Sequence, residues 1–202
     1  MSKYDIIALK KVNKENAMKN NKHYMVEIAR DAIREKLENR TIIDKEKLLK
    51  EHPELAQKGA AFVTLEKREA LRGCIGSLIA HRTLLDDLIE NARSAAFHDP
   101  RFPPLSKEEF EDPNLTIEVS LLSEPKPLPY TDVADLKSKI QPGRDGVILK
   151  LGHYQATYLP QVWEQLPRFE DFFATLCQKA GLPGNCLESH PEIYIYHAEK
   201  IK

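Results

Sequence analysis

The sequence lacks the features that mark a membrane or secreted protein. No run approaches 18 consecutive apolar residues, and no apolar signal-peptide core is found near the start of the 202-residue sequence. Three cysteines form an odd set without CxxC spacing, which argues against a disulfide framework and against a zinc site. We therefore expect a cytoplasmic protein that spans no membrane.

Motifs for nucleotides and metals are also missing. There is no GxGxxG or GxxxxGK[ST] loop to cradle phosphates, and no HExxH or paired-histidine spacing to hold a metal ion. The chain has no internal repeat and no low-complexity segment. From these absences we expect neither a metal ion nor a cofactor.

Charge is balanced over the whole chain but not along it. The formal net charge of −1 gives no general reason to expect nucleic acid or an anionic membrane as a partner. Residues 1–22 nevertheless hold six lysines against Asp5 and Glu15, a local net charge of +4. We interpret residues 1–22 as a solvated, lysine-rich arm, with contact to a polyanion as the alternative.

Hydrophobic periodicity predicts interspersed helices and strands. Apolar residues at helical spacing indicate helices over residues 23–39, 45–50, 83–97, 131–140, 160–166 and 168–180. Short or alternating apolar runs bounded by turn residues indicate strands over residues 59–65, 71–77, 114–122, 147–151, 153–159 and 191–200. The pattern predicts an α+β fold with a mainly antiparallel sheet and flanking helices. We expect the chain to pass between two unequal lobes at the proline-rich linker 124–129.

A lone cysteine lies between two glycines in the strand-like stretch LRGCIGS, residues 71–77. Strand alternation places Leu71 and Ile75 on an apolar side that faces the core. Cys74 then lies on the opposite side, together with Arg72. A structural cysteine would more naturally share the apolar side, so this stretch indicates a site.

Two interpretations of Cys74 remain open. A guanidinium on the same strand face favours the thiolate form, so Cys74 would be a reactive thiol and Arg72 would hold an anionic group. The glycines would then allow a ligand to approach the backbone at Gly73 and Gly76. The alternative is an inert cysteine packed beneath a helix, beside a surface arginine.

The other two cysteines point to structural roles. Cys177 lies on the aromatic stripe of the helix over residues 168–180, where we expect an inert core residue. A bond to Cys186 is geometrically conceivable, but we do not expect it in a reducing cytoplasm.

A cysteine nucleophile normally needs a base, and His98 is the first candidate among the seven histidines. It ends the helix over residues 83–97 and opens a loop that three prolines make stiff. Asp99 and Arg101 should therefore be held in place and face Cys74, so that Arg101 contacts a carboxylate or phosphate. The alternatives are a surface role for His98 and an ion pair that merely fastens the loop.

The cleanest alternation in the chain covers residues 114–122. Its polar side includes Glu118 and Ser120, which would either line a cleft or form the solvated side of a sheet.

Five segments of the chain stand out together: LRGCIG at 71–76, AAFHDPRFPPL at 95–105, IEVSLL at 117–122, DGVIL at 145–149 and ATYLPQVW at 156–163. In this order they resemble the AMMECR family, the domain named for an Alport, midface hypoplasia and elliptocytosis chromosomal region. The resemblance, to an archaeal or bacterial type of member, covers residues 23–200. It implies two unequal lobes with the cysteine motif at the cleft between them. It also implies Memo-like and radical S-adenosylmethionine proteins as partners in a modification system.

Three functions follow as hypotheses. The first is a thiol-dependent enzyme, or enzyme subunit, that uses Cys74. The second is a non-catalytic adaptor whose cleft binds a peptide or small ligand. The third is a regulatory factor that binds nucleic acid through the lysine-rich arm and scattered arginines; the neutral charge balance places it last.

Overall fold

The computed structural model describes residues 22–202, which divide into two compact units. Unit 1 comprises the described residues up to Leu121 together with Lys200–Lys202, and unit 2 comprises Leu122–Glu199. Each unit is described by itself. Apart from Lys22, the lysine-rich arm predicted over residues 1–22 lies outside the described residues.

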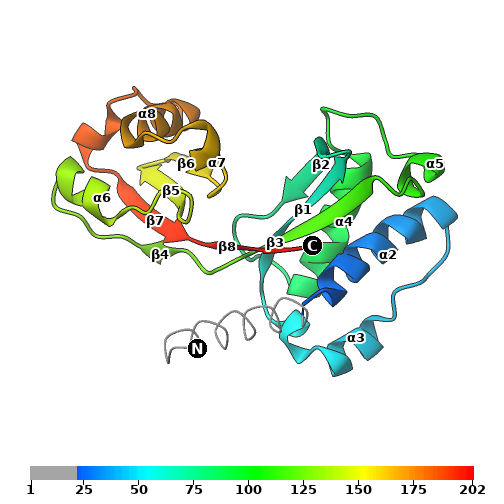
Figure 1. Cartoon of the computed structure of the whole chain (residues 1–202). Coiled ribbons are helices and arrows are strands. Elements are labelled where there is room, and N and C mark those ends of the chain that lie inside the picture. The colour runs from blue at the N-terminus through cyan, green and yellow to red at the C-terminus, as the bar shows by residue number, and fades with distance from the viewer. Residues whose placement is uncertain (1–21) are drawn as a thin grey trace, which may run out of the picture. The chain divides into compact units, whose positions relative to one another are not determined.

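Unit 1 contains a four-stranded sheet in the order β2-β1-β3-β8 (Figure 1). The strands are β1 (Ala60–Lys67), β2 (Ala70–Gly76), β3 (Leu115–Leu122) and β8 (Ala198–Ile201). β1 and β2, the strands predicted over residues 59–65 and 71–77, form an antiparallel hairpin that turns at Arg68 and Glu69, both at positive φ. β2 therefore lies at one edge of the sheet.

Two long helices cover the apolar face of this sheet. α4 (Leu84–Phe97) packs on β1 and β2, and α2 (Tyr24–Glu38) packs against α4. The remaining helices of unit 1 are α3 (Lys45–Glu51), the 3-10 turn η1 (Pro53–Ala56) and α5 (Lys107–Phe110). Side chains cap two of these helices: the Thr83 hydroxyl accepts the Asp86 N–H at the start of α4, and the Asp44 carboxylate accepts the Lys47 N–H at the start of α3.

A β-bulge at Arg72 breaks the strand alternation expected for residues 71–77. Leu65 on β1 is opposite Gly73, but the next residue, Glu66, is opposite Leu71, so Arg72 is the extra residue. A bulge re-aims the side chains around it. The expectation that Leu71 faces the core is wrong for this reason: its side chain is 44% exposed.

Unit 2 contains a second four-stranded sheet in the order β4-β7-β5-β6, antiparallel throughout. The strands are β4 (Lys126–Pro127), β5 (Gly146–Leu151), β6 (Tyr154–Tyr158) and β7 (Glu192–Tyr196). The helices are α6 (Val133–Lys139), α7 (Val162–Gln165), α8 (Phe169–Lys179) and the 3-10 turn η2 (Cys186–Ser189). Trp163 and Phe172 stack 3.6 Å apart in the core. The prediction of an α+β fold with mainly antiparallel sheets and flanking helices is confirmed.

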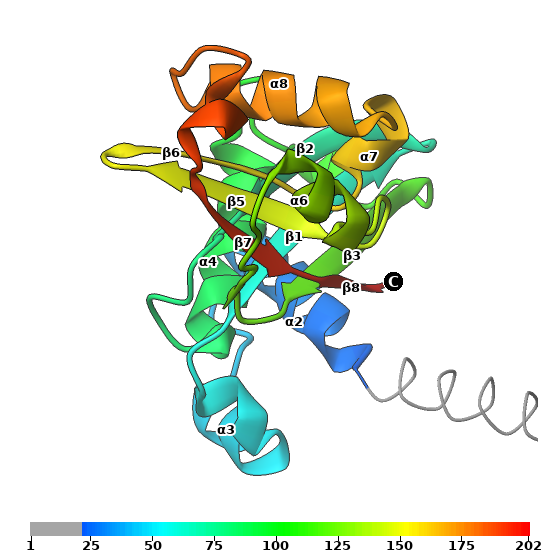
Figure 2. The same ribbon diagram turned by 90° about the vertical axis from the view of Figure 1, so that its left-hand side faces the viewer.

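The last part of the chain differs from the single strand predicted over residues 191–200. It forms two strands in two different sheets, β7 and β8, with His197 between them (Figures 1 and 2). Main-chain and side-chain bonds join Ser123 to His197 at this point. No glycine or proline lies between β7 and β8. The strand propensity of residues 191–200 therefore predicted one continuous strand.

The proline-rich segment 124–129 is also more regular than an extended linker. Lys126 and Pro127 form β4, which pairs with β7, and Leu128 N–H donates to the Ile193 carbonyl.

The expectations for Cys177 and Cys186 are corrected by a disulfide between them. Their Cα atoms are 5.8 Å apart, and both side chains are buried in the core of unit 2. The turn at Gly181 (φ +80°) returns the chain from α8 to η2 and so brings the two cysteines together. The odd cysteine count reflects one bridge plus one free thiol at Cys74.

No helix within residues 22–202 is both long enough and apolar enough to cross a membrane.

Removing the bridge should destabilise unit 2. Replacing both Cys177 and Cys186 by alanine releases a short loop and should lower the free energy of unfolding by about 2.5 kcal/mol. Chemical denaturation followed by Trp163 fluorescence measures this, because that side chain is in the core of unit 2. The unmodified protein, denatured without reductant, should give one titratable thiol. Three thiols under that condition would contradict the bridge.

Candidate functional site

Cys74 lies on β2 directly opposite Thr64 of β1. The two side chains share the face of the sheet opposite the apolar core, and the Thr64 hydroxyl donates to the Cys74 sulfur at 3.3 Å. The cysteine is free and partly exposed. It therefore meets the first condition for a reactive thiol, which is access.

β2 has β1 on one side and no strand on the other. The main-chain N–H and C=O of Cys74 are therefore bonded by an ion pair, where an inner strand would have a second neighbour. The Asp99 carboxylate accepts the Cys74 N–H at 2.9 Å, and Arg101 Nη2 donates to the Cys74 carbonyl at 3.2 Å. Arg101 Nε and Nη2 also donate to the two oxygens of Asp99, at 2.9 and 2.7 Å. These bonds fasten the stiff loop that follows α4 to the open edge of β2.

Asp99 is buried in an environment that favours its charged form. Hydrogen bonds from the Arg101 guanidinium, assisted by the main-chain N–H groups of Cys74 and Arg101, hold the pKa of Asp99 well below its usual range. The Asp99 hydrogen bond is also the first cause of the raised pKa of Arg101, and an electrostatic interaction with Cys74 contributes. The fastening interaction considered from the sequence is therefore present.

Arg101 still has donors directed away from Asp99. Its side chain is 53% exposed, and no described residue accepts a hydrogen bond from Nη1. A guanidinium carries five N–H donors in a planar fork, so two remain for a ligand oxygen. The predicted contact of Arg101 with a carboxylate or phosphate stays a prediction.

Arg72 does not have the position expected for an anion-binding residue beside Cys74. Its bulged conformation directs the guanidinium to Glu109, with Nε and Nη2 donating to the two carboxylate oxygens at 2.8 and 2.9 Å. Nη2 also donates to the Pro103 carbonyl at 2.9 Å. The buried side chain of Arg72 thus joins β2 to α5 and to the proline-rich loop. Its partner Glu109 was missed, although Ser106 and Glu109 have the spacing of a capping box.

Gly73 and Gly76 leave room for protein atoms. A Cβ atom on Gly73 would lie 2.2 Å from the Ala95 carbonyl oxygen of α4, and one on Gly76 would lie 2.2 Å from the Phe62 ring. Both glycines are therefore required by packing inside unit 1. Their predicted contact with a substrate stays a prediction.

Glu118 and Ser120 lie on β3, on the same sheet face as Cys74. Both are buried, and Glu118 forms ion pairs with Lys202 (3.2 Å) and Lys200 (3.7 Å). Lys202 also bridges to Glu66 on β1 at 3.5 Å. The polar side of β3 is thus a charge-paired surface, and not a freely solvated one.

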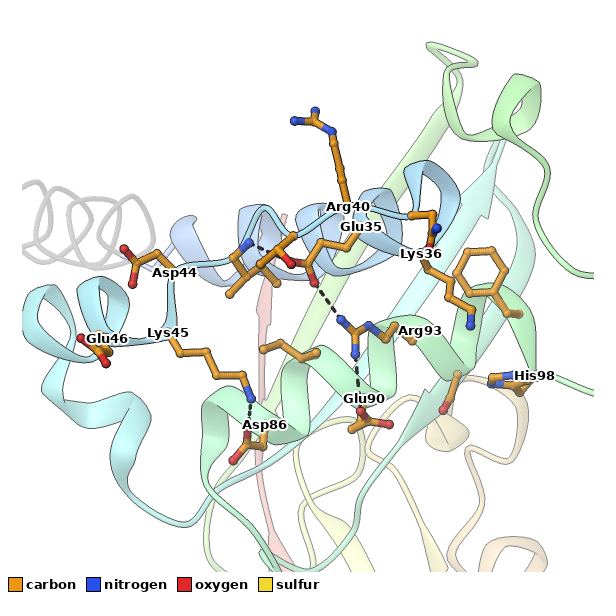
Figure 3. Close-up of a pocket in the computed structure, with 16 residues that line it drawn as sticks. Glu35, Lys36, Arg40, Asp44, Lys45, Glu46, Asp86, Glu90, Arg93 and His98 are labelled. Carbon is orange, nitrogen blue, oxygen red and sulfur yellow. Dashed lines mark hydrogen bonds and ion pairs between the residues drawn. The ribbon is translucent and has the colours of Figure 1, made fainter.

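His98 is directed to a different part of unit 1. Its exposed side chain lines a pocket of about 850 Å³ beside α2 and α4 (Figure 3). Among residues 22–202, no hydrogen bond or ion pair joins His98 to Cys74. The structure does not bring together the base and the nucleophile considered from the sequence.

The pocket beside α2 and α4 is crossed by ion pairs. Arg93 Nη2 donates to Glu35 at 2.7 Å and Arg93 Nη1 lies 3.7 Å from Glu90, while Lys45 donates to Asp86 at 2.7 Å (Figure 3). The Glu35 carboxylate also accepts the N–H groups of residues 42 and 43, and these bonds together lower its pKa against the effect of burial. These contacts fix the loop between α2 and α3.

A buried carboxylate on α4 was also missed. Asp87 accepts hydrogen bonds from the Ser77 hydroxyl, Arg82 and the Ala61 N–H, and Asn91 Nδ2 donates both to Asp87 and to the Ala61 carbonyl. The two polar residues occupy positions i and i+4 beside the apolar stripe of α4. That spacing places both side chains on one face of α4, and the structure turns this face toward Ala61 of β1.

Within the part of the chain that the structure describes, no three His, Cys, Asp or Glu side chains converge to hold a metal ion.

Comparison with known proteins gives one family. The family model described as AMMECR1 matches residues 26–201. A protein of Methanothermobacter thermautotrophicus is 42% identical over 178 residues, covering 85% of this chain and 88% of its own length. Protein PH0010 of Pyrococcus horikoshii is 38% identical over 187 residues, covering 87% and 86%. The crystal structure of PH0010 matches with a TM-score of 0.74 over 88% of this chain and 89% of that one, at 37% identity.

Replacing Asp99 by asparagine should reduce stability in a pH-dependent way. An amide has one acceptor oxygen and an NH2 group, so one N–H donor of Arg101 or Cys74 would face another donor. We expect a loss of about 2 kcal/mol at pH 6–8. Because the pKa of Asp99 is lowered on folding, its contribution is present above the unfolded value near 3.9 and falls away below it.

Urea denaturation of the unmodified chain and of Asp99→Asn, from pH 7 to pH 3, measures the difference between their free energies of unfolding. This difference should become smaller below about pH 4. The exposed Glu111→Gln variant, whose ion pair with Lys107 spans 3.9 Å, is the control and should change little. A difference that stays constant down to the lowest pH would contradict the account of Asp99.

Gly73→Ala should destabilise unit 1. The added methyl group meets a backbone carbonyl of α4 at 2.2 Å, so the helix or the strand must shift, at a cost of about 2–3 kcal/mol. Gly184→Ala is the matched control, because the nearest atom to its added Cβ, Nε2 of Gln178, is 3.6 Å away. Thermal unfolding of both variants tests the packing role of Gly73, and equal stability would overturn it.

Proposed function

The chain belongs to the AMMECR1 family, and we propose that it is a thiol-dependent enzyme, or the subunit of one, with Cys74 as its nucleophile. One observation carries the proposal. The chain's free thiol is partly exposed on a polar sheet face, beside an arginine with unoccupied donors. The other two cysteines are joined to each other, so Cys74 is the thiol available for chemistry.

The roles of the neighbouring residues follow from their contacts. The Thr64 hydroxyl donates to the sulfur and orients it, while Asp99 fixes the main chain of Cys74. Arg101 Nη1 would donate to a carboxylate or phosphate of the substrate and bring an electrophilic carbon towards the thiol. Arg101 therefore replaces Arg72 as the residue that holds the anionic group.

The alternative is a non-catalytic adaptor that binds a peptide or small ligand at the same residues. The two functions differ in their need for sulfur. Cys74→Ser should abolish turnover by an enzyme and leave ligand binding by an adaptor nearly unchanged. Nucleic-acid binding through the lysine-rich arm is the third function. It requires an oligonucleotide affinity that falls steeply with salt concentration.

The wider setting proposed for the protein rests on the family resemblance and on composition. It includes a cytoplasmic location and a modification system with Memo-like or radical S-adenosylmethionine partners.

Alkylation of the folded protein tests the role of Cys74. Iodoacetamide should label Cys74 without denaturant, and mass spectrometry locates the label. The positive charge of Arg101 should raise the rate at which the anionic reagent iodoacetate alkylates Cys74. In Arg101→Gln its rate relative to iodoacetamide should therefore fall about fivefold, the equivalent of about 1 kcal/mol of charge attraction.

Arg144→Gln is the matched control, since this arginine is exposed in unit 2 and bonded to Gln141. Labelling of Cys74 only after unfolding would make it a packing residue and end the thiol-enzyme proposal. An unchanged rate ratio in Arg101→Gln would remove the proposed anion contact.

A further inference from the structure

The segment that contains β4, at one edge of the unit 2 sheet, carries a proline at every second position. The segment Glu124–Pro129 reads EPKPLP, with prolines at 125, 127 and 129. Leu128 N–H donates inward to β7, so residues 125, 127 and 129 are those whose N–H groups would point away from the sheet. Proline has no N–H, and this edge therefore offers no donor to an added strand.

A groove of about 370 Å³ lies beside this edge. It is lined by residues 127–130 and 190–194, which all belong to unit 2. Prolines, leucine, isoleucine and tyrosines dominate the lining, and Glu192 is its carboxylate. Because the edge offers an added strand no N–H donor, a ligand here is held chiefly by the packing of its side chains.

The rings of the groove are held before any ligand arrives. Tyr130 stacks on His190 at 4.3 Å, and its hydroxyl donates to the Pro191 carbonyl at 2.7 Å. The Tyr194 hydroxyl donates to Glu192 at 2.8 Å, and the Lys150 ammonium lies 4.8 Å from the centre of the Tyr194 ring. Preformed rings reduce the entropy that a ligand loses on binding.

We propose that this groove of unit 2 binds a proline-rich segment that carries a basic residue. A polyproline II helix satisfies three conditions set by the groove: it needs no strand pairing, it is already ordered, and its prolyl rings pack on aromatic walls. Tyr194 and the Tyr130–His190 stack provide those walls. Glu192 is exposed and pairs with the basic side chain, which fixes the direction of the segment.

Fluorescence anisotropy with the full chain tests the proposal. The probe is a fluorescein-labelled peptide APPLPPRP, compared with a version in which alanine replaces each proline and one in which glutamate replaces the arginine. The first peptide should bind at least tenfold more tightly than either of the others. Tyr194→Ala should weaken its binding at least tenfold, and Glu192→Lys should reverse the preference for arginine over glutamate.

Two variants act as controls. Tyr154→Ala removes an exposed tyrosine on β6, outside the groove, and should leave the affinity unchanged. Tyr194→Phe keeps the ring and should bind nearly as well as the unmodified chain. This variant shows whether weaker binding by Tyr194→Ala comes from loss of the ring or from any change at residue 194. Absence of binding at about 1 mM peptide, or equal binding of the alanine version, would overturn the proposal.

Discussion

The edges of β-sheets present main-chain groups that must be satisfied without a neighbouring strand, and this constraint governs both units. In unit 1 the ion pair of Asp99 and Arg101 occupies the N–H and C=O of Cys74 on the edge strand β2. In unit 2 the outward N–H groups of one edge are removed by three prolines, and Lys179 donates to the Thr157 carbonyl on the strand at the other edge. At these edges side chains therefore bond or remove the main-chain groups that a further strand would otherwise pair.

This constraint explains why so many residues of the LRGCIG stretch have structural partners. Arg72 is the extra residue of a bulge and is anchored to Glu109, while Gly73 accommodates the backbone of α4. The side chain of Cys74 stays partly exposed once these requirements are met. A short, chemically suggestive motif can thus be mostly scaffold, with the main chain of its cysteine fixed by a carboxylate and a guanidinium from another loop.

Features controlled by local periodicity were predictable from the sequence, and features controlled by distant contacts were not. The helices over residues 23–39, 83–97 and 168–180 and the strand containing Cys74 follow from apolar spacing. The loop at Asp99 follows from its three prolines. The bulge at Arg72 depends on α5 and Glu109, which are far along the chain. The change of sheet at His197 depends on two separate partner strands, and the disulfide depends on how the turn after α8 closes.

The pairing of β8 with β3 has a consequence for synthesis on the ribosome. Nearly all of unit 2 is translated between these two strands, so most of unit 2 is made before the sheet of unit 1 can receive its last strand. During that interval β3 is an unprotected edge, and Glu118 has neither of its lysine partners. Ile201, buried in the core of unit 1, is translated after every strand of unit 2. The unit that begins first is therefore completed last, and a nascent chain stalled before β8 would expose the strand on which that core depends.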